Sequence, residues 1–257
     1  MINRNLYLKS FFTLVLVCVL LLPFQLSCTN IEKKVEDISY RTVQIVYVQT
    51  DGEETTGITS LGTGFIMNNK GYVITSGDIV NKGERYINEN GEGKVATVIP
   101  APSIAAGNDY TGFVTTNDLE VVAVDSEHNM ALLKLEFATV RSPGLGNKIS
   151  SVHYHNHANG TLEVGTADFT CSFSTGCSIA VMGFSSDEFV IETVTGEITS
   201  EKSYGVYDTN IFTDSDLSGS PVYLTASGKI IGVCVCDGSG GIIVVSSRYI
   251  NGLLNSV

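Results

Sequence analysis

The chain has 257 residues, with 15 basic against 27 acidic side chains and a formal net charge of -12. Such an acidic chain lacks the basic surface with which proteins neutralise a phosphate backbone, so we expect no nucleic-acid partner. Apolar residues make up 43% of the sequence, enough to bury a sizeable core, which argues against a disordered chain. The low charged fraction of 16% and the 26 glycines favour strands and turns over surface helices.

The first 27 residues have the pattern of an export signal. Arg4 and Lys9 precede an apolar run over residues 11–22, which is followed by Pro23 and the small residue Ser27. The run is shorter than the roughly 20 residues that a membrane-spanning helix needs. We therefore interpret residues 1–27 as a signal peptide that directs the protein out of the cytoplasm.

A lipid attachment site is predicted at Cys28. Residues 25–28 read Gln-Leu-Ser-Cys and resemble a bacterial lipobox, in which the cysteine becomes the lipid-modified N-terminus of the mature protein. Residues 28–39 are then expected to be a tether between the membrane and a folded domain. This places the protein in the cell envelope, lipid-anchored to a membrane and facing the periplasm or the surface. Cleavage with release and an uncleaved anchor are the alternatives.

Short alternating or β-branched runs recur along the chain between turn residues. They are residues 42–49, 62–67, 72–75, 94–99, 119–124, 130–135, 178–182, 190–193, 222–224, 230–236 and 242–245. Many short strands at this spacing predict an all-β sandwich or barrel. Helical periodicity is convincing only over residues 248–254, which predicts a short C-terminal helix. Pro143 and neighbouring glycines divide the pattern into two β units, about residues 40–140 and 148–250.

Three segments carry a family resemblance through their order and spacing. They are residues 62–66 (GTGFI) with 72–80 (YVITSGDIV) after a turn at 69–71, residues 125–135 (DSEHNMALLKL), and residues 193–200 (TVTGEITS) with 216–222 (DLSGSPV) and 228–233 (GKIIGV). Together they resemble the trypsin-like serine proteases, especially the Deg/HtrA type. The resemblance implies an all-β fold for residues 40–257: a trypsin-like double β-barrel with a short C-terminal helix.

The same resemblance assigns the catalytic positions. Asp78 stands where the family has its catalytic histidine, Asn129 where it has the triad aspartate, and Ser218 where it has the nucleophile. A serine hydroxyl is activated by an imidazole that a carboxylate orients. A carboxylate is a far weaker base than imidazole, and an asparagine amide is neutral. These replacements argue against catalysis and predict instead that Asn129 and Ser218 both donate hydrogen bonds to Asp78.

The position of the oxyanion hole also departs from the family pattern. The resemblance places the hole at Asp216 and Ser218, and Asp216 replaces a glycine whose backbone conformation other residues rarely adopt. A carboxylate beside a developing oxyanion opposes the transition state. Ser220 replaces a further glycine. We therefore predict a pseudoprotease that uses the retained cleft to bind a protein or peptide, or to regulate an active protease.

Two other functions are kept as alternatives. One is a serine endopeptidase that uses Ser218 with a non-standard base, either Asp78 or His128. The other is a metal-binding surface lipoprotein that uses the histidines at alternate positions of one strand, namely His153, His155 and His157. Imidazoles bind zinc, copper or nickel, but the same pattern fits the solvated face of a hairpin. No cofactor is expected otherwise, and zinc is the candidate metal.

Four cysteines outside the first 28 residues leave several interpretations open. Cys171, Cys177, Cys234 and Cys236 could form disulfides in an oxidising compartment. Cys234 and Cys236 share one face of a predicted strand, which makes a bond between them geometrically awkward. Connectivity is not determined by the sequence. Buried free thiols and a four-thiol zinc site are the other interpretations.

Overall fold

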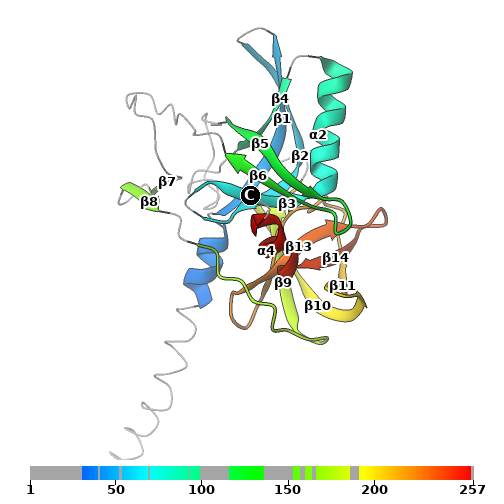
Figure 1. Cartoon of the computed structure of the whole chain (residues 1–257). Coiled ribbons are helices and arrows are strands. Elements are labelled where there is room, and N and C mark those ends of the chain that lie inside the picture. Colours follow the sequence, from blue (N-terminus) through cyan, green and yellow to red (C-terminus); the bar gives the residue numbers. More distant parts are fainter. Residues whose placement is uncertain are drawn as a thin grey trace, which may run out of the picture.

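The computed structural model describes residues 31–39, 41–51, 54–68, 70–91, 93–98, 116–135, 153–156, 160–163, 166–185 and 191–255. Strands dominate these residues and form two closed antiparallel barrels of six strands each. In Figure 1 the first barrel, coloured blue to green, lies above the second, coloured yellow-green to red. The predicted all-β double barrel is confirmed.

The first barrel closes in the order β1, β2, β3, β6, β5, β4. Its strands are β1 (Thr42–Asp51), β2 (Glu54–Ile66), β3 (Tyr72–Ser76), β4 (Gly93–Val98), β5 (Thr116–Asp125) and β6 (Met130–Leu135). Alternate side chains of these strands, such as Ile45, Val73 and Leu133, fill its interior. Strands β1, β3 and β6 are buried on both faces over most of their length, which matches their many β-branched and aliphatic residues.

The second barrel closes in the order β10, β11, β14, β13, β12, β9. Its strands are β9 (Ser178–Phe184), β10 (Ile191–Ser203), β11 (Val206–Phe212), β12 (Pro221–Leu224), β13 (Ile230–Cys236) and β14 (Gly241–Ser246). Its interior contains Ile179, Val222 and Val244, all fully buried. A separate two-stranded hairpin, β7 (His153–Asn156) with β8 (Gly160–Glu163), lies to one side of the barrels in Figure 1.

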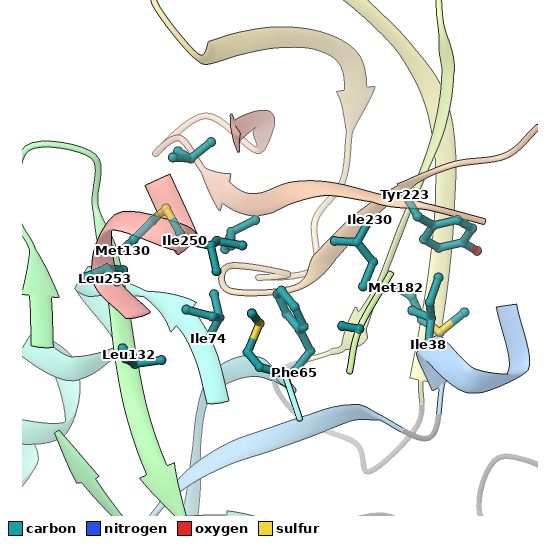
Figure 2. Close-up of a cluster of buried hydrophobic side chains, with 14 of the residues drawn as sticks. Ile38, Phe65, Ile74, Met130, Leu132, Met182, Tyr223, Ile230, Ile250 and Leu253 are labelled. Atoms are coloured by element: carbon teal, nitrogen blue, oxygen red, sulfur yellow. The ribbon is translucent and has the colours of Figure 1, made fainter. Parts of the chain in front are cut away.

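A third apolar cluster fills the space between the barrels (Figure 2). Phe65 comes from the first barrel, Met182 and Ile230 come from the second, and all three are buried. The C-terminal helix α4 (Arg248–Asn255) adds Ile250 and Leu253 to the same cluster. Burying a large apolar side chain stabilises the fold by about 1.5–3 kcal/mol. The cluster therefore fixes the two barrels, and the residues between them, relative to each other.

The N-terminal helix over residues 31–39 differs from the predicted tether. Its Ile38 is 2% exposed and belongs to the cluster between the barrels, and Val35 packs against the same cluster. Lys34 forms a 2.8 Å ion pair with Asp168. Ile31, Val35 and Ile38 follow helical spacing, but the charged residues between them gave this segment a polar composition. The folded part thus extends beyond the predicted start at residue 40. None of the described helices is long and apolar enough to cross a membrane.

Two further elements were not predicted from the sequence. Helix α2 (Gly77–Asn90) packs on the first barrel, where Gly83 is required because a Cβ atom would lie 2.6 Å from Val95. Its two glycines and three asparagines have low helix propensity, so no clear helical pattern is visible in the sequence here. Strand β11 was also missed. It contains the polar sequence Asp-Thr-Asn, which is unusual for a strand.

Candidate functional site

The start of helix α2 is capped by Asn129 from a distant turn. The preceding Ser76 makes no side-chain capping bond. Asn129 Oδ1 accepts a hydrogen bond from the backbone N–H of Asp78 at 2.9 Å, and Asn129 O accepts one from the N–H of Gly77 at 3.0 Å. Asn129 has a φ of 52°, a left-handed conformation that asparagine tolerates better than most residues. This asparagine thus satisfies two of the free N–H groups of the helix.

Asp78 completes a small hydrogen-bonded pair with Asn129. The Asn129 Nδ2 group donates to Asp78 Oδ1 at 3.3 Å, so the predicted bond from asparagine to aspartate is present. A carboxylate in the first turn of a helix is also favoured by the helix dipole. The Ser218 hydroxyl, which was expected to donate to Asp78, instead accepts a hydrogen bond from the N–H of Cys236 at 3.2 Å.

The turn that contains Ser218 is held tightly against the first barrel. Ser218 is 1% exposed, and its carbonyl oxygen accepts a 3.0 Å hydrogen bond from the N–H of Thr63 on β2. Gly219 follows with a φ of 82°, and a Cβ atom there would lie 1.9 Å from Thr63 O. Only glycine fits this close approach. The position of Ser218 is therefore fixed by contacts between the two barrels.

The Asp216 carboxylate is hydrogen-bonded to the backbone N–H of Ser218. Its Oδ1 atom accepts a 3.2 Å hydrogen bond from that N–H, while its Oδ2 atom forms a 2.5 Å ion pair with Lys82. Burial alone would raise the pKa of Asp216, but the hydrogen bonds from Lys82 and Ser218 and the positive charge of Lys82 outweigh burial and hold the pKa below its ordinary value. A negative charge therefore sits where the family places its oxyanion donors.

Lys82 is a site residue that the sequence analysis missed. It lies on α2 four residues after Asp78, so the two side chains share one face of the helix. Its ion pair with Asp216 links the helix to the second barrel. The four-residue spacing was visible in the sequence, but it indicates a shared face only if the segment is helical.

The cysteines of β13 lie beside the serine. Cys234 is fully buried, Cys236 is partly buried, and their Sγ atoms are 4.0 Å apart. All four described cysteines are free. Cys171 Sγ contacts the Ser247 hydroxyl at 3.4 Å, away from the β13 pair. The expectation of buried free thiols therefore holds for Cys234, whereas Cys171, Cys177 and Cys236 are free but exposed or partly exposed.

His128 is turned toward helix α4. Its Nδ1 atom lies 2.8 Å from Asp125 Oδ2 in the same turn, and its ring stacks on Tyr249 with 3.6 Å between ring centroids. These contacts engage one ring nitrogen, Nδ1, and one face of the imidazole, and none of them involves Ser218. They give no support to His128 as the base for Ser218.

The predicted metal and lipid sites fall largely outside the described residues. His153 and His155 lie on β7, where the register pairs His153 with Glu163 of β8, but only their backbone is described. His157 and Cys28 lie outside the described residues. Within the part of the chain that the structure describes, no three His, Cys, Asp or Glu residues are grouped to hold a metal ion. Zinc binding and lipid attachment stay predictions.

Comparison with known proteins identifies the family. A family model for the trypsin-like peptidase domain matches residues 62–233, a range that includes Asp78, Asn129 and Ser218. The chain belongs to this family. A search of the curated proteins found no match.

A solved structure supports the trypsin-like fold. The serine endoprotease from Yersinia pestis matches with a TM-score of 0.55 and 12% sequence identity, over 88% of this chain. The match covers 65% of the endoprotease chain, so this protein spans less than two thirds of that length. Identity this low shows the fold alone. The trypsin-like double barrel is thus established, and the chemistry depends on the residues present.

The capping role of Asn129 predicts a loss of stability in Asn129→Ala. Removal of an N-terminal helix cap costs about 1–2 kcal/mol, and alanine also tolerates the left-handed conformation poorly. We expect urea unfolding to show a decrease of about this size. Asn129→Gly also removes the capping side chain, but glycine adopts the left-handed conformation without strain. Comparison of the two variants therefore separates the effect of the lost cap from the effect of backbone strain. The control Asn251→Ala, at an exposed site on α4, should change stability by less than about 0.5 kcal/mol. Equal stabilities for Asn129→Ala and the control would contradict the capping role.

Because Asp216 is ionised in the folded protein, we predict that it contributes to the free energy of unfolding and that this contribution is lost at acidic pH. The pKa of Asp216 in the folded protein is lowered from 3.8, so the unfolded chain binds the proton more readily. The contribution is present above about pH 4 and is lost as the pH falls through the lowered pKa. Asp216→Asn should therefore lose less stability than the wild type between about pH 6 and pH 3, as measured by urea unfolding. Asp214→Asn, at an exposed position two residues before Asp216, is the control. Equal acid sensitivity of wild type and Asp216→Asn would disprove this contribution.

Proposed function

We propose that this protein is an exported, lipid-anchored pseudoprotease: a trypsin-like family member that does not hydrolyse peptide bonds and binds a protein or peptide partner in the cell envelope. The observation that carries the proposal is the Asp216 carboxylate, which accepts the hydrogen bond of the Ser218 N–H and is kept ionised by Lys82. This arrangement opposes stabilisation of the oxyanion, and the carboxylate of Asp78 at the position of the base opposes removal of the serine proton.

The first step is removal of the serine proton. In the pattern of the family a histidine performs it, whereas this chain places Asp78 at that position. The Asp78 carboxylate receives its hydrogen bond from Asn129, whose other polar atoms cap helix α2. A carboxylate with an amide partner has too little basicity to activate a hydroxyl. The pair is better suited to holding the helix than to moving a proton.

The second step is stabilisation of the oxyanion. Loss of a single oxyanion donor lowers kcat by about 10²–10³-fold in serine proteases. Here the Ser218 N–H is already bonded to Asp216 Oδ1, and the bound group carries a full negative charge. A tetrahedral oxyanion would have to displace that carboxylate and would be repelled by it. The penalty is therefore expected to exceed that of a missing donor.

Retention of an intact scaffold with exposed aromatic side chains supports a binding function. Tyr204 and Phe212, in the β10–β11 region, are 76% and 74% exposed. Exposed aromatic side chains are enriched at protein interfaces, where they bury large areas at small entropic cost. The turn that carries Ser218 is meanwhile fixed by Thr63 and Gly219. The exposed aromatic side chains offer contact area to a partner, and the fixed turn keeps the scaffold that carries them rigid.

A fluorophosphonate serine probe tests the absence of an activated nucleophile. We expect no mass adduct on the wild-type protein, because Ser218 has neither a strong base nor a free oxyanion amide. An active trypsin-like protease labelled in parallel shows that the probe is reactive, and Ser218→Ala controls for adducts elsewhere. An adduct that forms on the wild type and disappears in Ser218→Ala would establish the serine hydrolase alternative instead.

Lipid attachment at Cys28 predicts a specific difference between two cysteine variants. We expect the wild-type protein to partition into detergent from a membrane fraction and its N-terminal peptide to begin at a lipid-modified Cys28. Cys28→Ser should lose the lipid, because no thiol remains at the cleavage site. Cys18→Ser, in the apolar run of the signal, should behave like the wild type. A lipid-free protein that starts after residue 27 would mean simple cleavage and release.

A further inference from the structure

The end of strand β13 holds two thiols in close contact beside Ser218. Successive side chains of a strand alternate between faces, so Cys234 and Cys236 lie on the same face of β13. Their Sγ atoms are 4.0 Å apart, which is within hydrogen-bond distance for sulfur. The backbone N–H of Cys236 donates to the Ser218 hydroxyl oxygen at 3.2 Å. The thiol pair therefore belongs to the same part of the molecule as the candidate site.

The two thiols have different surroundings. Cys234 is fully buried among the interior side chains of the second barrel, whereas Cys236 is partly exposed at the end of the strand. A hydrogen bond from Cys234, with one from Ser218, lowers the pKa of Cys236 despite burial and the nearby charge of Asp216. Burial raises the pKa of Cys234. Cys236 is thus the more accessible and the more easily ionised thiol of the pair, which makes it the better nucleophile, and Cys234 lies buried behind it.

We propose that Cys234 and Cys236 form a thiol-modification site, in which Cys236 reacts with a small disulfide and Cys234 then displaces the adduct to leave a Cys234–Cys236 disulfide. This inference goes beyond the proposed function and does not depend on it. It assigns a reactive role to two residues that neither proteolysis nor partner binding requires.

The reaction balances in two exchange steps. The Cys236 thiolate attacks one sulfur of a small disulfide, RSSR, forms a Cys236–SR mixed disulfide and releases RS⁻. Cys234 then attacks Cys236 Sγ, its proton passes to the departing sulfur, and the second RSH leaves. The protein loses two electrons and the small disulfide gains them. The oxidant is therefore the small disulfide itself, and no metal or other cofactor takes part.

The geometry predicts a bond that forms and is easily reduced. Two residues of extended strand span about 6.6 Å, which is at the upper end of the Cα separations that disulfides bridge. Cys236 is the last residue of β13, directly before the turn that begins at Asp237. A bond under this constraint is more reducible than an unstrained structural disulfide. The site is consequently suited to reversible modification.

Peptide mapping of the full chain tests the proposal with oxidised glutathione as the small disulfide. After exposure, remaining thiols are blocked with N-ethylmaleimide and the protein is digested with trypsin. Cys234 and Cys236 share the peptide 230–248, whereas Cys171 and Cys177 share 149–202. We expect peptide 230–248 to lose about 2 Da and to carry no maleimide, which marks an internal disulfide. Before oxidation, Cys236 should react with maleimide at least about tenfold faster than Cys234.

Variants separate the two steps. Cys234→Ser should stop the reaction at a stable glutathione adduct on Cys236, and Cys236→Ser should leave peptide 230–248 without an adduct. Cys171→Ser is the matched control and should form the internal disulfide as the wild type does. If Cys234→Ser does not fold, the peptide map of the oxidised wild-type protein and the maleimide reaction rates of Cys236 and Cys234 still test the proposal. The proposal is overturned if peptide 230–248 keeps two maleimides after oxidation, or if it is cross-linked to peptide 149–202.

Discussion

Thr63 is the residue through which the two barrels are joined at the site. Its side chain is fully buried, and its N–H donates to Ser218 O while its hydroxyl oxygen accepts the N–H of Phe184 from β9. Its carbonyl oxygen accepts the Thr75 hydroxyl at 2.6 Å and lies where a Cβ of Gly219 would clash. Because each of these polar groups is buried, the loss of any bond would leave an unsatisfied partner. The serine turn therefore has little freedom to move relative to the first barrel.

This junction holds the two barrels together through few residues. Thr63 and Gly219 bring β2, β3 and the serine turn into close contact, and these contacts use no side chain at positions 78, 129 or 216. The side chains at those positions have structural roles of their own. Asn129 caps helix α2, and Asp216 pairs with Lys82 from that helix. Each of these interactions strengthens the contact of α2 with its surroundings.

Most strands of the barrels could be predicted from the sequence, because a strand that is buried on both faces is a nearly continuous run of apolar residues. The bounds of β6 (Met130–Leu135) and β13 (Ile230–Cys236) agree with the predicted runs. Helix α2 was not predicted, since Gly83 and several asparagines break the propensity pattern, and its stability comes from packing and from the Asn129 cap. The N-terminal helix was hidden for a related reason. Its apolar stripe is separated by charged residues that face away from the core.

The site was predicted in its positions more than in its contacts. The replacement of family residues at 78, 129, 216 and 218 is a property of the sequence alone. The capping bonds of Asn129 and the ion pair of Lys82 depend on a helix and a turn that are 51 and 134 residues away along the chain. Contacts at such separations are set by the tertiary fold, so local sequence patterns do not predict them. The bond from Cys236 to Ser218 belongs to the same class.

The negative charge of Asp216 depends on groups that other parts of the chain supply. A carboxylate introduced at this partly buried position would be costly without a counter-charge and hydrogen bonds. Lys82 supplies the counter-charge and a hydrogen bond, and the Ser218 N–H supplies a further hydrogen bond. One of the contacts that stabilise the carboxylate therefore occupies the amide that oxyanion binding would use. Removal of the Asp216 carboxylate would leave Lys82 without this ion pair and would also free the Ser218 amide. The arrangement is therefore coupled across both barrels, because Lys82 comes from the helix on the first barrel and Asp216 from a loop of the second.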